Sequence, residues 1–304
     1  MIKYFITFIF LFFTAASFAQ ERAFSIADIG SSAKYIGLGG VELSTNSAAS
    51  VFHNPALITA HHTYSVSMFT TQLFDEVTYR NLAVSYKLNK FNFALGMMDV
   101  RVSDIPETTK VVTNSDYYFD INGYYDLHFF MYKAAVNYRF NPRFSLAMGL
   151  SYIDNSISSI SATGFNLDVG TFYKLNTHYM SFSIDNILQN YDLEYSNNGT
   201  ESYPLKTTFA YRKNWPFLSF LIQSSFVQDN LPQYGTGIEL KHPSFSFLDA
   251  FVGYKSDYYL DEQDYKLTLG FGLNFFGVSF HYAYQKSDYF QEDNYSFFSM
   301  DLNI

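Results

Sequence analysis

The stretch "KLTLGFGLNFFGVSFHYAY", residues 266–284, has a large apolar side chain at every second position, with mostly small or polar residues between. Successive side chains of an extended chain point to opposite faces, so Leu269 and Phe271 share one face and Thr268 lies on the other. The pattern restarts after Phe276–Gly277, which predicts two strands joined there by a very tight turn. Each strand is about ten residues long, above the roughly five or six usual in soluble sheets. The apolar faces therefore need a larger apolar partner than one sandwich core.

The N-terminus has the features of a secretory signal peptide. Lys3 precedes the apolar run "YFITFIFLFFTAA", and the small residues Ser17 and Ala19 occupy the cleavage positions. A membrane anchor is the alternative, but the run is short for a span and no stop-transfer charges follow it. We expect cleavage after Ala19, and hence export. With 0 Cys the chain has no lipid-attachment cysteine and forms no disulfide.

The composition is typical of an outer-membrane β-barrel. Aromatic residues make up 20% of the chain, with 27 Tyr and 34 Phe, while the mean hydropathy is −0.06. No segment after the signal peptide is a continuous apolar run of about twenty residues, which excludes spanning helices. The formal net charge of −9 argues against nucleic acid as a partner. An exported, aromatic-rich chain with alternating strands is expected in the bacterial outer membrane, in contact with lipid and lipopolysaccharide.

The same alternation recurs along the chain and predicts an all-β transmembrane barrel of about 14 antiparallel strands, an even number as bacterial barrels require. The strands are expected near residues 63–71, 77–88, 91–101, 128–140, 143–153, 163–175, 177–187, 204–214, 217–227, 233–241, 246–255, 264–275, 277–286 and 294–304. Short connections at 89–90, 141–142, 176, 215–216, 242–243 and 276–277 alternate with long ones at 102–127, 154–162, 188–203, 256–263 and 287–293. This alternation predicts periplasmic turns, external loops and two periplasmic termini.

Two strands show the expected faces. In "RFSLAMGLSY" Leu146 and Met148 alternate with Ala147 and Gly149, so we expect lipid to contact the large residues and the lumen the small ones. The strand ending at Ile304 should pair with the first strand, which removes the open edges that lipid does not tolerate. Barrel assembly machinery commonly recognises such a terminal strand, although Ile304 replaces the more usual Phe.

The segment between the signal peptide and the barrel lacks the strand period. We expect residues 20–62 to form an N-terminal hatch, with residues 63–304 as the barrel. Ile36, Leu38 and Phe52 need burial, and the glycines allow a close approach to a barrel wall. A short helix capped by Asn46 or Ser47 is expected before a turn at 54–55. A free periplasmic tail is the alternative.

The sequence "GSSAKYIGLGGVELSTNSAASVFHNPALI", residues 30–58, resembles the N-terminal signature of the PorV/PorQ family, which is itself similar to the FadL-type fatty-acid transporters. The matching hatch motif consists of Ser32, Ala33, Gly37, Gly39, Gly40, Asn54, Pro55 and Ala56, with His53 where an aromatic residue is usual. "LDVGTFYKL", "SIDNILQN" and "YPLKTTFAY" also resemble this family. The resemblance implies a fourteen-stranded barrel with a hatch, and a role in the type IX secretion system of Bacteroidota or as a related outer-membrane component.

Two functions remain open on the sequence. The resemblance favours an interaction protein that binds a secretion translocon or a secreted cargo protein. The alternative is a FadL-like channel whose hatch gates the passage of a hydrophobic molecule. Aromatic residues in the long connections suit either role, as binding anchors or as pocket linings. The candidate partner-binding residues are Tyr117, Tyr118, Phe119, Tyr124, Tyr125, Tyr258 and Tyr259.

The sequence offers little for catalysis or metal binding, and we expect no enzyme, cofactor or metal site. Ser279 and His281 share the lumen face of one strand, but no orienting third group can be named. In an extended chain His61 and His62 point to opposite faces, which is poor geometry for one metal. The acidic loop residues lack EF-hand spacing, although Ca²⁺ binding or a bridge to lipopolysaccharide stays open for them. They are Asp257, Asp261, Glu262, Asp264, Asp288, Glu292 and Asp293.

Overall fold

The computed structural model describes residues 29–58, 62–74, 76–113, 116–188, 193–196, 200–228, 231–241, 247–259, 262–286 and 294–304. Within 257–259 and 262–264 it describes the backbone alone. The predicted signal peptide lies outside these residues. No helix in the described part has the length and apolar character needed to cross a membrane.

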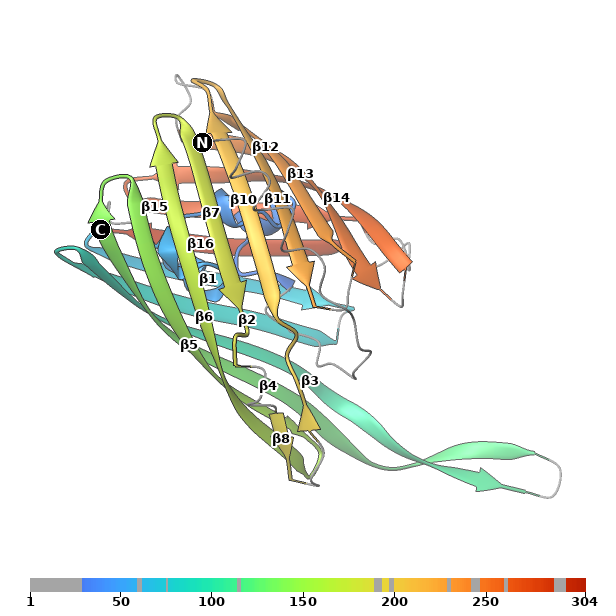
Figure 1. The fold of residues 1–304 in the computed structure, drawn as a ribbon. Coiled ribbons are helices and arrows are strands. Elements are labelled where there is room, and N and C mark those ends of the chain that lie inside the picture. The colour runs from blue at the N-terminus through green and yellow to red at the C-terminus, as the bar shows by residue number, and fades with distance from the viewer. Residues whose placement is uncertain are drawn as a thin grey trace.

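The sheet contains 16 strands, and all but β8 and β9 close into a barrel of fourteen (Figure 1). Every pairing is antiparallel, and β1 pairs with β16 to complete the ring. The backbone N–H groups of Thr63 and Tyr64 donate to the carbonyl of Ile304 across this seam. The strands are β1 Tyr64–Leu73, β2 Val77–Leu88, β3 Phe91–Val112, β4 Tyr117–Asn141, β5 Phe144–Ile157, β6 Ile160–Leu175, β7 His178–Asp185, β8 Leu193–Tyr195, β9 Thr200–Glu201, β10 Lys206–Asn214, β11 Leu218–Val227, β12 Gln233–Lys241, β13 Leu248–Tyr259, β14 Glu262–Phe275, β15 Val278–Gln285 and β16 Tyr295–Asn303.

The predicted fold class is confirmed, and so is the tight turn between β14 and β15. Phe275 pairs with Val278, which leaves two residues in the turn. Phe276 and Gly277 have φ angles of 47° and 87°. Two positive φ angles are the requirement of the type I′ turn, whose twist matches that of the strands it joins.

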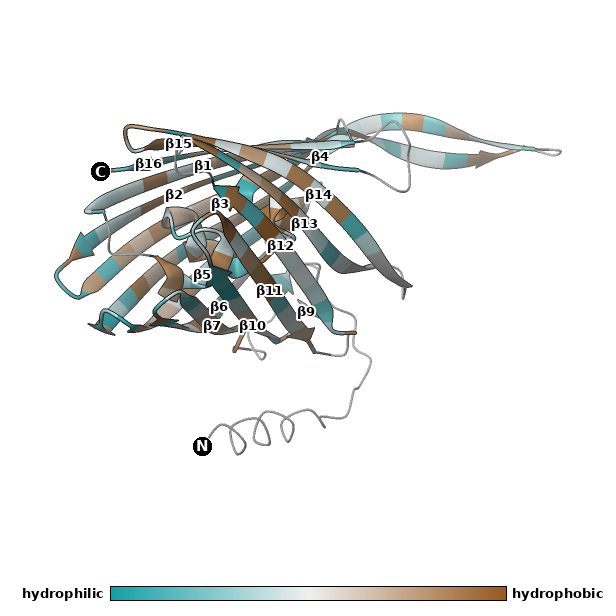
Figure 2. Ribbon diagram, turned by 90° about the horizontal axis from the view of Figure 1, so that it is seen from above, coloured by the Kyte–Doolittle hydropathy of each residue, from teal (hydrophilic) through white to brown (hydrophobic). Residues whose placement is uncertain are grey.

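The barrel is apolar outside and mostly small or polar inside. On β5 Met148 and Leu150 are each 49% exposed, whereas Ala147, between Leu146 and Met148, is 2% exposed. Figure 2 shows brown and paler segments alternating along the strands. Exposed large apolar side chains on every wall are unfavourable in water and favourable in lipid. The predicted lipid and lumen faces of this strand are confirmed.

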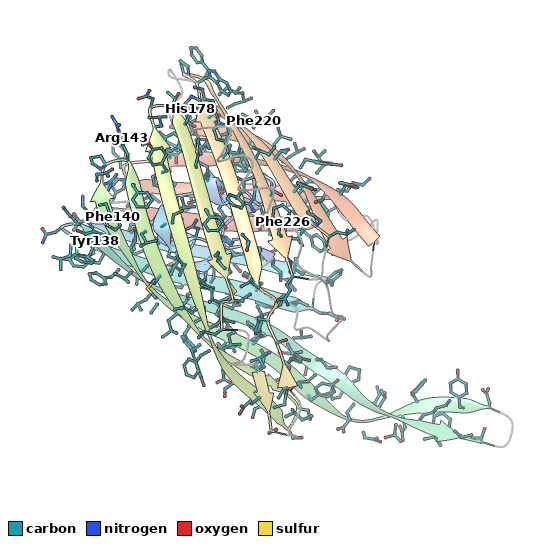
Figure 3. The ribbon with its side chains drawn as sticks, viewed as in Figure 1. Tyr138, Phe140, Arg143, His178, Phe220 and Phe226 are labelled. Carbon is teal, nitrogen blue, oxygen red and sulfur yellow. The ribbon has the colours of Figure 1, made fainter. Side chains whose placement is uncertain are left out.

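Aromatic side chains gather on the outer wall near the short turns. Figure 3 shows Tyr138, Phe140 and Phe220 towards that end of the barrel. The ring centroid of Tyr138 lies 4.8 Å from that of Phe140 and 4.9 Å from that of Phe91. Such a row is the aromatic girdle expected where a barrel wall meets the polar boundary of a bilayer.

The long loop predicted at 102–127 is wrong. β3 and β4 continue as a paired two-stranded ribbon far beyond the rim of the barrel, interrupted by two register shifts (Figures 1 and 2). The connections expected at 154–162 and 256–263 are likewise mostly strand. Outside the membrane neither face of a strand is buried against lipid, so the apolar alternation that identifies strands disappears. Residues 103–112 and 117–126, most of which pair with each other, are called the arm below.

Residues 29–58, called the hatch below, lie inside the barrel. They contain the helix α2 Ala33–Gly37 and three 3₁₀ turns, Glu42–Ser44, Ala48–Phe52 and Pro55–Leu57. Ser32 caps α2 by accepting from the N–H of Tyr35 at 3.2 Å, as N-cap serines do. Ile36, Leu38 and Phe52, expected to need burial, are at most 4% exposed. The blue helical segments in Figure 1 are enclosed by the strands.

Candidate functional site

The candidate site is the contact between the hatch and the barrel wall, because the hatch lies across the lumen. Its backbone comes very close to the wall at Leu38 and Gly39, where β12 and β13 carry Gly235, Gly237 and Gly253. A Cβ atom on Gly253 would lie 2.6 Å from the carbonyl carbon of Leu38, and one on Gly237 would lie 2.7 Å from its oxygen. Only glycine leaves room for this backbone contact. We call these three wall residues the glycine seat.

The hatch glycines fit the same contact. Gly39 has φ +71°, a conformation that side chains other than glycine rarely adopt, and a Cβ there would overlap the carbonyl oxygens of Thr236 and Tyr254. Gly37 leaves space for the ring of Phe251. The carbonyl of Gly40 accepts from the side-chain amide of Gln223 at 3.1 Å.

A buried charge network ties α2 to the same wall. The ammonium of Lys34 lies 2.6 Å from Oε1 of Glu239, whose side chain is fully buried on β12. Arg212 of β10 lies 2.6 Å from Oε2 of Glu239 and donates a second bond, at 3.1 Å, to the carbonyl of Leu43. Lys241 lies 3.2 Å from the same carboxylate. A buried carboxylate needs such partners, because an unpaired charge in the interior is strongly unfavourable.

Glu42 and Asn54 hold the middle of the hatch on the adjoining part of the wall, at β7, which pairs with β10. The side-chain amide of Asn54 donates to Glu42 at 3.2 Å, and the hydroxyl of Ser183 on β7 donates to Glu42 at 2.9 Å. Asn54 also caps the following turn by accepting from the N–H of Ala56 at 3.0 Å. Burial raises the pKa of Glu42, and the hydrogen bonds from Ser183 and Asn54 oppose that shift.

His53 packs within the hatch. Its ring stacks on Tyr35 with centroids 3.9 Å apart, and its Nε2 shares a hydrogen bond with the hydroxyl of Ser31. Burial lowers the pKa of His53 well below its usual value, and the nearby charges of Lys206 and Lys133 lower it further. His53 is therefore neutral in the docked hatch.

The first and last strands also bind the hatch. The N–H of Ala33 donates to the hydroxyl of Ser299 on β16 at 3.1 Å, and the N–H of Ala48 donates to Ser65 on β1 at 3.2 Å. Next to Pro55, the carbonyl of Ala56 accepts from Ser145 at 3.0 Å. The hatch therefore forms hydrogen bonds with the strands on both sides of the seam between β1 and β16.

The lumen is polar on one side of the hatch and apolar on the other. Towards the short turns lies a cavity of about 480 Å³ lined almost wholly by polar residues, among them Lys241, Asn274, Ser279 and Asp301. Towards the long connections lies an apolar cluster on the lumen face of β1 to β5 and β16, called the apolar lumen cluster. It comprises Phe69, Tyr79, Met98, Val100, Phe129, Met131, Ile153 and Phe297.

The apolar lumen cluster is packed directly against the hatch. The ring of Phe69 lies 5.5 Å from that of Tyr79 and 6.3 Å from that of Phe297. The hydroxyl of Tyr79 donates to the carbonyl of Gly30 at 2.9 Å. The apolar lumen cluster therefore packs between the loop end and the hatch.

Among the described residues, the candidates for catalysis and metal binding do not form a reactive arrangement. Ser279 and His281 both line the polar cavity, and Nδ1 of His281 lies 3.6 Å from Asp301, but within the described residues no hydrogen bond joins the serine to the histidine. His62 is exposed, and His61 lies outside the described residues. The described part contains no group of three metal-ligating side chains. The acidic loop side chains lie outside what the structure describes.

The predicted partner-binding residues fall on strands. Tyr117, Tyr118, Phe119, Tyr124 and Tyr125 belong to the arm portion of β4. The backbone of Tyr258 and Tyr259 ends β13, and their side chains lie outside the described residues.

Comparison with known proteins identifies the fold. No protein-family model and no curated protein matches the sequence. The toluene transporter TodX of Pseudomonas putida matches with 8% identity and a TM-score of 0.57, covering 94% of this chain and 98% of TodX. A FadL homologue from Pseudomonas aeruginosa matches with 11% identity and a TM-score of 0.58, covering 93% and 99%. A TodX deltaS2 mutant, a monoaromatic hydrocarbon channel, matches with 10% identity and a TM-score of 0.61, covering 90% and 98%.

The chain has the FadL-type barrel fold. That fold is the one of outer-membrane barrels, and the apolar outer wall and the aromatic girdle of this chain suit the same environment.

In this FadL-type barrel the residues of the predicted hatch motif lie at the contact with the wall, and the wall residues that they meet were not predicted. Gly235 and Gly237 alternate in "YGTGIEL", and Gly253 follows in "FVGYK". Three glycines at lumen positions of neighbouring strands are a signal of close backbone approach that was available in the sequence. The charge partners Glu239 and Arg212 carry no such signal, because their pairing with the hatch depends on the closed barrel.

Proposed function

We propose that this FadL-type barrel is an outer-membrane channel for small hydrophobic molecules, gated by its hatch. The observation that carries the proposal is the apolar lumen cluster lying between the loop end and a hatch that crosses the lumen. An apolar lining lowers the free energy of a hydrophobic solute in the lumen relative to water. TodX, which shares the fold, is a monoaromatic hydrocarbon channel, and this supports small aromatic molecules as the first substrates to test.

In this proposal the loops and the arm face outwards and both termini face the periplasm. Passage requires the hatch to shift, because Leu38 and Gly39 rest directly on the wall. The hatch is held by hydrogen bonds that each contribute about 0.5–3 kcal/mol, by one charge network and by buried apolar side chains such as Leu38 and Phe52, so in this proposal its shift breaks these contacts together.

The test is uptake of a labelled monoaromatic hydrocarbon by cells carrying the protein, its gene deletion or single variants. Met98 and Met97 are neighbours on β3 with opposite faces, the first fully buried in the lumen and the second 38% exposed to the outside. Met98→Gln places an amide in the apolar path and should lower uptake severalfold, whereas Met97→Gln should leave it unchanged. Equal uptake by the deletion strain and the wild type would refute the channel.

A second candidate function is protein binding in secretion. The hatch motif resembles the PorV/PorQ family, and the arm presents exposed aromatic side chains such as Phe119 at 60% and Tyr124 at 65% exposure. These features favour a partner protein, either a type IX translocon or a secreted cargo. In the deletion strain, retention of secreted proteins in the periplasm with normal uptake would favour this function over the channel.

A further inference from the structure

The arm is a two-stranded ribbon with unpaired edges. β2 begins at Val77, opposite Val102, and β5 ends at Ile157, opposite Leu127, so beyond these points the described strands of the arm pair only with each other. Figure 1 shows the arm projecting well past the ends of the other strands. An exposed strand edge presents a row of unpaired backbone N–H and C=O groups, which is a template for another strand.

One face of the arm is aromatic. The register places Tyr117, Phe119 and Ile121 on the same face as Val112 and Lys110. The rings of Tyr117 and Phe119 lie 5.9 Å apart, and the Lys110 ammonium lies 4.1 Å from the centre of the Tyr117 ring. These apolar side chains are 53–72% exposed. A large exposed apolar face of this kind marks an interaction surface.

A bulge keeps this face continuous. The register shift between Glu107 and Thr108 leaves Asn122 without an opposite residue, which returns Tyr124 to the aromatic face. Tyr124 is 65% exposed. Bulges are used to re-aim side chains in this way.

The arm as a whole is acidic, and its opposite face carries Glu107 and Asp120 beside Tyr118. The described arm and its ends contain Asp104, Glu107, Asp116, Asp120 and Asp126 against one cation, Lys110. Like charges disfavour a second copy of the arm as the occupant, and a basic partner is complementary. The arm projects away from the rim of the barrel, which disfavours the surrounding lipid surface.

The two edges are not equivalent. β3 contains Pro106, which has no N–H to donate to an added strand, whereas β4 has no proline between Tyr117 and Asp126. The β4 edge is therefore the one open to pairing, over the regular stretch Tyr117–Ile121 that precedes the bulge at Asn122.

We propose that the β4 edge of the arm binds an extended, basic segment of a partner polypeptide by strand addition. Side chains of an added strand alternate between the two faces of the ribbon. The partner segment therefore alternates apolar residues, which pack on the aromatic face, with Lys or Arg, which meet Asp120 on the opposite face. This inference deepens the proposed protein-binding function and is independent of the channel.

The test uses the full chain in lipid nanodiscs and a labelled ten-residue peptide of alternating Lys and Val, with binding followed by fluorescence anisotropy. Two further peptides carry N-methyl groups on alternate amides, one set for each edge of the peptide strand. Strand addition predicts that one methylated peptide loses binding at least about tenfold while the other binds like the parent, because only one edge pairs with β4. Equal binding of all three peptides would overturn strand addition and leave protein binding through side chains standing.

Two variants test whether the peptide binds to the arm or to another surface of the protein. Asp120 lies in the arm opposite Thr109, outside the barrel. Asp120→Lys should weaken peptide binding at least about fivefold at low salt, with a smaller loss at high salt. The control Glu194→Lys makes the same charge change at an exposed position on β8 and should leave binding unchanged. Binding to empty nanodiscs, or equal weakening by both substitutions, would overturn the arm as the site. Uptake of hydrocarbons should be unaffected by Asp120→Lys, which keeps this result distinct from the channel.

Discussion

Replacing Gly253 with alanine is expected to loosen the hatch without preventing barrel assembly. The added Cβ would overlap the backbone nitrogen of Gly39 and lie 2.6 Å from the carbonyl carbon of Leu38 and 2.7 Å from the carbonyl oxygen of Gly37. All three are backbone atoms, so no side-chain rotation relieves the overlap. The hatch must move away from β13 by most of an ångström.

The structure allows the size of the effect to be worked out. Inserting a methyl group into a well-packed contact costs typically about 1–3 kcal/mol. Each 1.4 kcal/mol is a factor of about ten in an equilibrium, so the displaced hatch should become roughly five to 150 times more populated. The matched control is Gly149→Ala, also on the lumen face, where the nearest atom to the new Cβ is Cε of the Lys133 side chain at 3.3 Å and no backbone atom overlaps it.

Two measurements report hatch displacement. One is the conductance of the purified protein in planar bilayers, and the other is the rate of tryptic cleavage after Lys34 in proteoliposomes. Both should rise for Gly253→Ala and stay near the wild-type values for Gly149→Ala, while heat-modifiability on gels shows that each barrel has folded. Wild-type conductance and protection in a folded Gly253→Ala protein would refute the close-packed seat.

Further predictions concern the wall and the buried titratable groups. Phe280→Arg on the lipid face should cost about 2–4 kcal/mol and impair assembly, and Ser279→Arg in the polar cavity should cost much less; equal heat-modifiability of the two would contradict the assigned faces. Burial lowers the pKa of His53, so docking of the hatch should weaken as the pH falls below about 6.5, where His53 of the displaced hatch takes up a proton. His53→Gln should remove this pH dependence of the protection of the hatch from trypsin. Because burial raises the pKa of Glu42, docking should weaken as the pH rises from about 4.5 through the raised value, and Glu42→Gln should flatten this second slope.

The barrel strands were predictable because lipid imposes a strict period of two. Met148 and Ala147 must lie on opposite faces, and no other arrangement satisfies both lipid and lumen. The arm was not predicted, because outside the membrane lipid no longer imposes this period of two. Between Pro106 and Gly123 both faces meet water, and these two residues indicate turns in a sequence even when bulges accommodate them in a ribbon.

The hatch half of the site was predictable from local features, and its partners were not. Gly39 belongs to a glycine-rich stretch, which indicates a backbone conformation that other residues rarely adopt, and Leu38 is an apolar residue that needs burial. Lys34 gave no indication that it pairs with Glu239, because the two residues meet only when the chain has closed into a ring. Contacts between distant segments depend on the register of every strand between them.

The seam between β1 and β16 has a consequence for the order of folding. Ala33 is made before any strand, but its hydrogen-bond acceptor, Ser299, belongs to the last one. The hatch therefore has no complete binding surface until the final strand has paired, and its docking spans nearly the longest loop the chain can close. Contacts this distant in sequence form late and slowly, because their entropy cost is met before any of their energy is gained. A docked hatch thus reports that the ring is complete, and a nascent barrel lacking β16 should expose residues 29–58 to proteases and chaperones throughout its lifetime.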